Sequence, residues 1–309
     1  MIDFNGQSAI VTGAGRGLGR LYALELARRG AQVVVNDIGG SVTGSGSDPS
    51  VADDVVREIT EAGGTAVASH DSVDSAEGGA SIVQAAIDAF GRLDAVIANA
   101  GIYEMVPFTD LSVDQWRRML RIHLDGAFYL SQPAFRVMKA QGYGRFVMVS
   151  SQIGAFGQEL TAHYGSAKGG IIGLTNALAA EGAPHGIHAN AILPIGQTRM
   201  MTGSMEDRDP NPTVDALFAE TTPERVVPMV VYLASRDCTR NKHLYSAAGG
   251  RYARVFIGLG EGWLADRGTT PSTDDIAAHL DEIDDLDGFT IPATSSDEIV
   301  GLLKRLEIL

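Results

Sequence analysis

The sequence predicts an α/β protein with a doubly wound, mostly parallel sheet, helices on both faces of that sheet and a helical C-terminal extension. Short apolar runs rich in β-branched residues alternate with longer segments of helical spacing over the first two thirds of the 309 residues. This alternation is typical of βαβ units. The short runs are apolar throughout, as expected of strands that helices cover on both sides.

Strands and helices are expected to alternate along the chain. The expected strands are Ser8–Val11, Gln32–Asn36, Thr65–Ser69, Ala95–Ala98, Arg145–Ser150 and His188–Leu193. The expected helices are Gly17–Gly30, Val51–Gly63, Ala76–Gly91, Val113–Gln141 and Tyr164–Gly182. The Gly- and Ser-rich stretch Gly39–Ser50 interrupts this order, and we interpret it as a long surface loop after the second strand.

The C-terminal part has a different composition. Residues 270–309 contain ten acidic and two basic residues, which contributes −8 to the net charge of −14. Helices are expected after Ser272 and after Ser296, because each serine precedes acidic residues that suit a helix N-terminus. We therefore expect a sheet domain over 1–268 and an acidic helical extension over 269–309 packed on it. A solvated extension, a lid and a subunit contact all remain open.

Charge and cysteine content disfavour several classes of protein. The 38 acidic and 24 basic residues make nucleic acids and anionic membranes poor partners, because both are polyanions. Cys238 is the only cysteine, which excludes an intramolecular disulfide and a cysteine-based zinc site. No apolar run reaches about 18 residues, so no membrane insertion is expected. The acidic N-terminus is unlike a secretory signal, and a cytoplasmic protein is expected.

A glycine-rich turn joins the first strand to the first helix. Residues 12–19 read TGAGRGLG. Glycine allows a sharp turn and a close approach to a ligand, and free N–H groups at a helix start can bind a pyrophosphate. The turn predicts a Rossmann-like dinucleotide site, although its spacing differs from the common Gly-x-Gly-x-x-Gly and a turn without ligand is the alternative. The residues expected there are Gly13, Arg16, Gly17, Leu18 and Gly19.

Asp37 ends the second strand, about 20 residues after the glycine turn. A carboxylate at this place can accept hydrogen bonds from the ribose hydroxyls of an adenosine and would repel a 2′-phosphate. Arg16 favours the opposite choice, since an arginine in the turn can contact that phosphate. We expect NAD as the cofactor, and the alternative reading of Asp37 is a solvated acid at a strand end.

Tyr164, Lys168 and Ser151 form the candidate catalytic set. Tyr164 and Lys168 lie four residues apart in a helical segment, so their side chains share a face. An ammonium group near a phenol favours the phenolate and lowers its pKa from the ordinary value of about 10. Ser151 follows an apolar strand and can hold a substrate oxygen. A half-buried core tyrosine is the alternative for Tyr164.

These residues resemble the short-chain dehydrogenase/reductase family over roughly 5–240. The motifs that carry the resemblance are TGAGRGLG, Asn99-Ala100-Gly101, Ser151 and YGSAK at 164–168. The resemblance implies that Tyr164 is the general acid/base, that Lys168 binds the nicotinamide ribose, and that Ser151 positions the substrate oxygen. It also implies further contacts to the cofactor from Asp71, Ser72, Asn99, Pro194 and Thr198.

A narrower resemblance points to the (3R)-hydroxyacyl-CoA dehydrogenase domain of the multifunctional β-oxidation enzymes. It rests on VVVNDIGG with its long loop, HDSVD at 70–74, RIHLDGAF at 121–128 and IHAN at 187–190. His123 stands where most of the wider family has an asparagine that holds a relay water, so it is either an altered relay member or a structural histidine. After Leu233 the sequence departs from the usual final strand of the family.

The resemblance implies oxidation of a (3R)-hydroxyacyl-CoA to the 3-ketoacyl-CoA with NAD, including thioesters that carry a sterol side chain. A hydroxysteroid dehydrogenase and a 3-ketoacyl-carrier-protein reductase are the alternatives, although the net charge and Asp37 disfavour the second. A nucleotide sensor without catalysis is a further alternative. The expected partner is a small acyl-CoA or steroid-like substrate, and a homodimer or homotetramer is expected by resemblance only.

Overall fold

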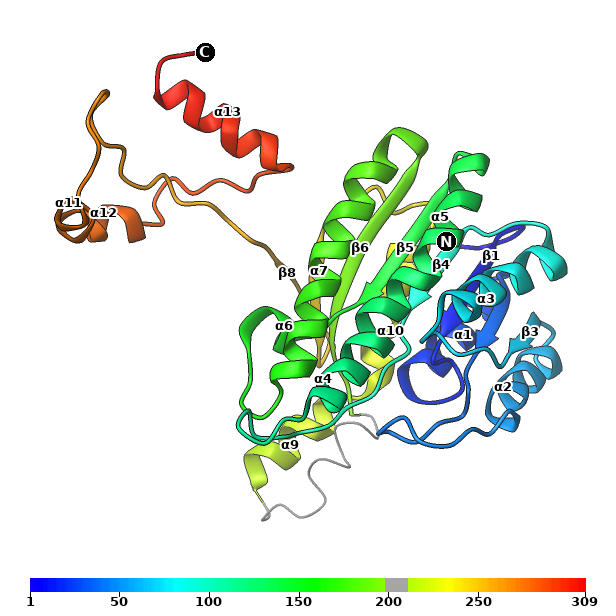
Figure 1. The fold of residues 1–309 in the computed structure, drawn as a ribbon. Coiled ribbons are helices and arrows are strands. Elements are labelled where there is room, and N and C mark those ends of the chain that lie inside the picture. The colour runs from blue at the N-terminus through cyan, green and yellow to red at the C-terminus, as the bar shows by residue number, and fades with distance from the viewer. Residues whose placement is uncertain (198–210) are drawn as a thin grey trace. The chain divides into compact units, whose positions relative to one another are not determined.

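Eight strands form one sheet in the order β3-β2-β1-β4-β5-β6-β7-β8 in the computed structural model of the protein, which describes residues 1–197 and 211–309 (Figure 1). Neighbouring strands from β3 to β7 run parallel. The chain reverses its direction of travel across the sheet between β1 and β4, which is the switch point where such sheets bind ligands. The strands are β1 Ser8–Thr12, β2 Gln32–Asn36, β3 Thr65–Ser69, β4 Ala95–Ala98, β5 Gly144–Val149, β6 Ile187–Ile195, β7 Leu244–Ala248 and β8 Arg251–Val255.

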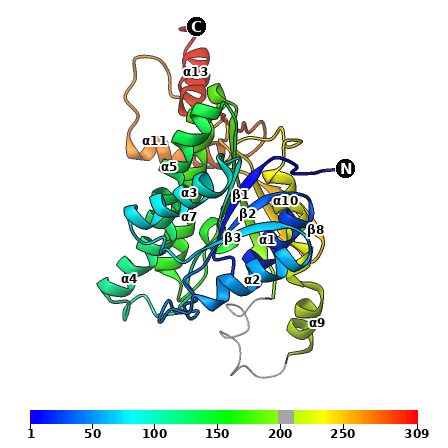
Figure 2. The same ribbon diagram turned by 90° about the vertical axis from the view of Figure 1, so that its right-hand side faces the viewer.

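Helices cover both faces of the sheet (Figure 2). On one face α1 Gly17–Arg28 packs against both α2 Ser50–Glu61 and α10 Val227–Ala234. On the other face α5 Gly126–Gln141 packs against both α3 Ala76–Phe90 and α7 Ala162–Gly182. The central strands are buried from end to end, because both of their faces are covered. The fold class and the alternation of elements agree with the expectation from the sequence.

The helical segment expected over Val113–Gln141 is divided by a π-helical turn. It consists of α4 Val113–Leu120, the π turn Arg121–Asp125 and α5. A π turn adds one residue to the helical repeat and changes the direction of the side chains that follow. His123 lies within this turn and is buried.

The final parallel strand is present, contrary to the expectation for the segment after Leu233. Strand β7 pairs in parallel with β6, with Leu193 opposite Ser246. Gly249 and Gly250, both at positive φ, then form the two-residue turn that leads into β8. The two glycines permit this tight turn, because neither carries a Cβ that would disfavour a positive φ.

The structure forms two compact units, Met1–Arg254 and Val255–Leu309. The second unit contains α11 Thr273–Ala278, α12 Leu280–Asp284 and α13 Ser295–Arg305. Ser272 caps α11 as expected, whereas α13 begins earlier than predicted, with Thr294 and Asp297 in a capping box. The domain boundary after residue 268, and the packing of the extension on the sheet domain, stay predictions.

Two further α-helices and two 3-10 turns, Ala183–His185 and Pro223–Arg225, belong to the described chain. Helix α6 Gln152–Phe156 follows β5, and α9 Pro212–Glu220 follows β6. Within the residues that the structure describes, no helix is both long and apolar enough to cross a membrane.

Candidate active site

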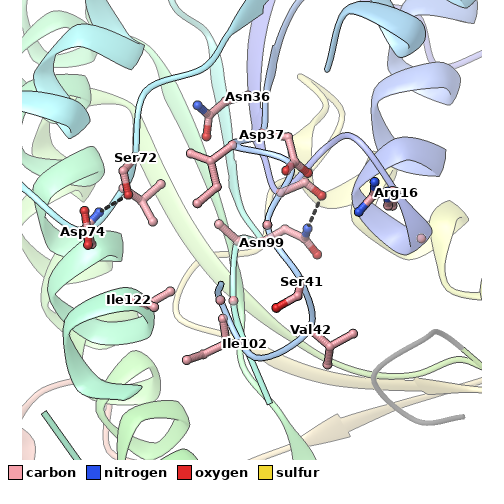
Figure 3. Close-up of a pocket in the computed structure, with 18 of the residues that line it drawn as sticks. Arg16, Asn36, Asp37, Ser41, Val42, Ser72, Asp74, Asn99, Ile102 and Ile122 are labelled. Atoms are coloured by element: carbon pink, nitrogen blue, oxygen red, sulfur yellow. Dashed lines mark hydrogen bonds between the residues drawn. The ribbon is translucent and has the colours of Figure 1, made fainter. Parts of the chain in front are cut away.

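A cleft opens at the carboxyl ends of β1, β2 and β4, where the switch point lies (Figure 3). Arg16 and Asp37 stand on one side of it, and Ser72 and Asp74 on the other. The cleft therefore brings together most of the cofactor-binding residues that the sequence predicts. Of those, the lining includes Gly13, Arg16, Gly17, Leu18, Asp37, Asp71, Ser72 and Asn99.

The lack of a side chain at Gly13 and at Gly19 allows two different close contacts, one with the segment after β4 and one between α1 and the turn. Gly13 has a φ of +63°, and a Cβ there would lie 2.9 Å from the Cα of Ala100. A Cβ on Gly19 would lie 2.1 Å from the carbonyl oxygen of Gly13. The role of Gly19 is therefore to let helix α1 pack closely against the turn, and not to contact a ligand. Asn99 fixes the turn, since its Nδ2 donates to the carbonyl oxygens of Thr12 (2.9 Å) and Gly13 (3.1 Å).

The carboxylate of Asp37 is held by backbone N–H groups at the rim of the cleft. Its Oδ2 accepts from the N–H of Gly15 at 2.9 Å and its Oδ1 from the N–H of Gly39 at 2.7 Å. This places a fixed negative charge beside the glycine turn. Arg16 also lines the cleft but lies at the helix N-terminus, where its backbone is extended.

The end of β3 supplies a second group of polar side chains. Asn36 donates from Nδ2 to the carbonyl oxygen of Asp71 at 2.9 Å, which ties the two strand ends together. The Oδ2 of Asp71 accepts from Ser81 at 2.9 Å. Asp71 and Ser72 thus line the cleft opposite the glycine turn, where the resemblance expects adenine contacts.

The loop after β2 is more than a surface loop. Ser41, Val42 and Gly44 line the cleft, and the carbonyl oxygen of Val42 accepts from the N–H of Tyr103 at 3.1 Å. A Cβ on Gly44 would lie 2.9 Å from the side chain of Ile102. The glycine and serine content predicted a loop, but no signal in the sequence indicated which surface this loop would contact.

Tyr164, Lys168 and Ser151 meet at the end of β5. Ser151 caps α6, and its Oγ accepts from the N–H of Ile153 at 3.1 Å. Tyr164 and Lys168 lie on α7, with the Nζ of Lys168 5.8 Å from the centre of the Tyr164 ring. Lys168 donates to the carbonyl oxygen of Val149 at 2.6 Å. All three side chains are almost fully buried.

Burial dominates the ionisation of this pair. It raises the pKa of Tyr164 to about 12, and a hydrogen bond with Ser151 opposes that rise only in part. Burial also lowers the pKa of Lys168 to about 7. For Tyr164 the direction is opposite to the one that the neighbouring lysine alone predicts, because removing both groups from water penalises both charged forms.

His123 lies against the catalytic tyrosine. Its ring is perpendicular to the ring of Tyr164 at 5.2 Å between centres. Its Nε2 lies 3.0 Å from the nitrogen and 2.8 Å from the oxygen of Ile102, and the tautomer decides which of these bonds forms. Burial, and then the charge of Lys168, hold the pKa of His123 well below its usual range, so the ring is neutral.

A small cavity of about 10 Å³ is lined by both His123 and Lys168. Among the described residues, the Nδ1 of His123 has no hydrogen-bond partner although it is buried. The cavity is at the lower limit of the space that one water molecule needs, and its polar lining includes Thr12. The geometry therefore allows a water molecule between the imidazole and the ammonium group.

One expected site residue lies outside the cleft, and another is not among the described residues. Pro194 is near the end of β6, opposite Ala247 of β7, and does not line the cleft. Thr198 lies outside the described residues. Sequence reasoning missed Tyr103, whose ring is perpendicular to that of Tyr164 at 5.1 Å between centres. Its place shortly after Asn99-Ala100-Gly101 is the one signal that could have indicated it.

The pattern of the short chain dehydrogenase family matches residues 7–209. This match covers more than half of the chain, and the protein belongs to the short-chain dehydrogenase/reductase family of oxidoreductases. Members of this family typically use NAD or NADP. The cleft fits such a cofactor, because the glycine turn, the start of α1 and the carboxylate of Asp37 line it together.

Several relatives are similar to this chain over most of its length. A short-chain type dehydrogenase/reductase of Mycobacterium tuberculosis is 43% identical over 282 residues, which cover 91% of this chain and 95% of the relative. The peroxisomal multifunctional enzyme type 2 of Mus musculus is 39% identical over 99% of this chain, but the match spans only 40% of the mouse enzyme. The structure of the Drosophila melanogaster enzyme of that name superposes with a TM-score of 0.81 at 31% identity, covering 99% of this chain and 50% of the other.

The first prediction concerns the close approach of Gly101 and His123. A Cβ on Gly101 would lie 2.2 Å from the Cε1 of His123. We expect Gly101→Ala to lower the free energy of unfolding by about 1–3 kcal/mol, as overpacking does. Urea denaturation of Gly101→Ala, His123→Ala and the double variant measures this, and the double variant should be less unstable than the sum of the single variants. Additive losses would contradict the contact.

The second prediction concerns pH and Lys168. Its pKa of about 7 in the folded protein lies below the value of about 10.4 in an unfolded chain, so folding releases its proton between these pH values. The stability of the wild type should therefore rise with pH from about 7 upward, by at most about 1.4 kcal/mol per pH unit, relative to Lys168→Met. Denaturation of both proteins at several pH values measures the difference. A constant difference would mean that Lys168 stays charged in the fold.

Proposed function

We propose that the protein oxidises the 3-hydroxyl group of a (3R)-hydroxyacyl-CoA thioester, with NAD as the acceptor. The observation that carries the proposal is the meeting of Ser151, Tyr164, Lys168 and His123 at the end of β5, next to a cleft with Asp37 at its rim. The similarity to multifunctional enzymes over nearly the whole chain supports the acyl-CoA substrate.

The residues of the glycine turn, Asp37, Asn99 and Lys168 would hold the cofactor. When bound, the oxidised nicotinamide ring supplies the hydride acceptor and a positive charge in the same site. Tyr164 removes the proton from the substrate hydroxyl, and Ser151 donates a hydrogen bond to the substrate oxygen. A positive charge beside the phenol favours the phenolate, and so opposes the effect of burial on the pKa of Tyr164.

The proton taken by Tyr164 must leave the buried site. Lys168 lies next to the phenol, and the cavity lined by Lys168 and His123 can hold a connecting water. The neutral imidazole of His123 can donate or accept at Nδ1, which faces no other described partner. We assign His123 the place in this proton route that an asparagine has in most of the family.

Asp37 supports NAD over NADP. Its two oxygens are fixed by backbone N–H groups, so the carboxylate cannot turn away from a ligand without losing both bonds. A 2′-phosphate brought to this position would meet an immobile negative charge, while ribose hydroxyls would find a hydrogen-bond acceptor.

The catalytic proposal predicts the effect of a single hydroxyl group. Tyr164→Phe should lower kcat by at least about 100-fold, since it removes the group that takes the proton. Tyr22→Phe is the matched control, because the buried hydroxyl of Tyr22 has no hydrogen-bond partner in the described part of the chain. The assay follows NADH formation from a (3R)-hydroxyacyl-CoA. Activity of Tyr164→Phe near that of Tyr22→Phe would contradict the assigned role.

The cofactor proposal predicts a preference and its loss. The wild type should have a higher kcat/KM with NAD than with NADP, and Asp37→Ser should reduce this ratio by at least about 10-fold, because the repulsion is removed. Asp74→Asn removes one negative charge from the same cleft at a different place and is the control. A wild type that prefers NADP, or equal ratios in the two variants, would overturn the assignment.

A further inference from the structure

Arg16 is the residue of the cofactor cleft that favours a 2′-phosphate, and it belongs to two hollows of the surface. It lines the cofactor cleft together with Asp37, and it lines a second hollow, at the starts of α1 and α2, together with Asp48. A guanidinium at the glycine turn suits a phosphate, because it carries a permanent charge and several N–H donors. Each hollow therefore contains one carboxylate and the same cation.

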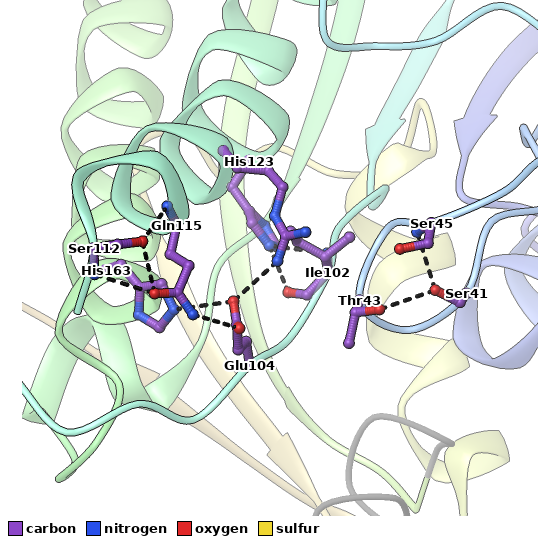
Figure 4. A network of polar contacts seen from close by, with 10 residues as sticks. Ser41, Thr43, Ser45, Ile102, Glu104, Ser112, Gln115, His123 and His163 are labelled. Carbon is purple, nitrogen blue, oxygen red and sulfur yellow. Dashed lines mark hydrogen bonds and ion pairs between the residues drawn. The ribbon is translucent and has the colours of Figure 1, made fainter. Parts of the chain in front are cut away.

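The loop after β2 returns to its own starting point at Asp48. The N–H of Asp48 donates to the carbonyl oxygen of Ile38 at 2.9 Å, which closes the loop. Inside the loop the Oγ of Ser41 accepts from the N–H of Ser45 at 3.0 Å and lies 3.1 Å from the hydroxyl of Thr43 (Figure 4). The loop thus has internal hydrogen bonds of its own, and these help to fix where Asp48 lies.

The end of this loop packs against the glycine turn. The N–H of Val51 donates to the carbonyl oxygen of Asp48 at 3.3 Å, and the side chain of Val51 fills the space that a Cβ on Gly15 would need. The N–H of Gly15 donates to the carboxylate of Asp37 at 2.9 Å. The turn therefore contacts the strand end through Asp37 and the loop end through Val51, which brings Asp48 into the hollow that Arg16 lines.

The carboxylate of Asp48 has a defined orientation and a stable charge. Its Oδ1 accepts from the N–H of Ser50 at 3.1 Å and from the hydroxyl of Ser50 at 2.6 Å. These hydrogen bonds lower the pKa of Asp48, and the nearby charge of Arg16 lowers it further. Asp48 is therefore ionised at neutral pH, and its charge acts on Arg16.

The second arginine of that hollow is already paired. The Nη2 of Arg20 donates to both carboxylate oxygens of Glu58 at 2.6 Å. Within the described ranges 1–197 and 211–309, no acid forms such an ion pair with Arg16. The guanidinium of Arg16 is therefore the one of these two that a phosphate could engage without breaking an ion pair.

We infer that Asp48 is a second residue that determines cofactor specificity, because its carboxylate offsets the charge of Arg16 and so disfavours a 2′-phosphate. This inference rests on the proposed preference for NAD. A 2′-phosphate near Arg16 meets the charges of both Asp37 and Asp48, and one cation offsets only one of them. Removal of both carboxylates leaves Arg16 able to bind the phosphate.

The test measures binding of adenosine 2′,5′-bisphosphate and of AMP by titration calorimetry, since the two ligands differ only in the 2′-phosphate. Asp48→Asn keeps an acceptor for Ser50 but removes the charge. It should raise the affinity for the bisphosphate relative to AMP by about fivefold at low salt, and less at high salt. Asp37→Ser/Asp48→Asn should exceed Asp37→Ser by a similar factor, and adding Arg16→Gln should abolish that gain.

Two further variants serve as controls. Asp54→Asn removes a charge from the same hollow, but Asp54 is paired with Arg57 at 2.6 Å, so the affinity ratio should stay within about twofold. Asp48→Glu keeps the charge and should keep the wild-type ratio. The ratio compares two ligands on one protein, so it reports the 2′-phosphate even where a substitution weakens both.

The outcomes separate the inference from the proposed function. A wild type that binds AMP more tightly, with an unchanged ratio in Asp48→Asn, would refute the role of Asp48 alone. A gain that persists with Arg16→Gln would also overturn the inference, because the carboxylate would then act without the arginine. A wild type that binds the bisphosphate more tightly contradicts the proposed NAD preference. The binding measurement needs no turnover, so failure to oxidise a hydroxyacyl-CoA would leave the inference standing.

Discussion

The burial of Tyr164 and Lys168 is the constraint on which the rest of the site depends. Burial disfavours the phenolate and the ammonium together, and raises the pKa of one group while it lowers that of the other. Burial thus opposes both the phenolate form of Tyr164 and the ammonium form of Lys168, which are the forms that the proposed reaction uses. The carbonyl oxygen of Val149 accepts from Lys168, the hydroxyl of Ser151 hydrogen-bonds Tyr164, and the imidazole of His123 packs against the Tyr164 ring. A positively charged cofactor would favour the phenolate of Tyr164.

The parallel sheet places these groups where they can act together. The carboxyl ends of β1, β2, β4 and β5 meet at one edge, so segments far apart in the chain converge there without long connections. Gly13 and Gly19 allow the first helix to begin directly against that edge. The same edge then provides a cleft with a fixed carboxylate on one side and a buried tyrosine farther along it.

The sequence predicted the architecture well, because the strands are apolar runs and the helices between them have a regular apolar period. The predicted bounds of β2, β3 and β4 agree with the structure, and the glycine turn, Asp37 and the Tyr164–Lys168 pair lie where local spacing indicates. Three features depend on contacts between distant segments and had no local signal. These are the π turn that holds His123, the docking of Val42 on Tyr103, and the direction of the pKa shift of Tyr164, which depends on burial.

The absence of a side chain at Gly101 has a consequence for how this site can change over generations. The imidazole of His123 occupies the volume that any larger residue at 101 would need. While His123 is present, substitution of Gly101 by a larger residue is opposed by steric overlap with the imidazole ring. The two positions therefore constrain each other. While His123 is present, a larger residue at position 101 is disfavoured, so His123 must be replaced by a smaller residue before Gly101 can be replaced by a larger one.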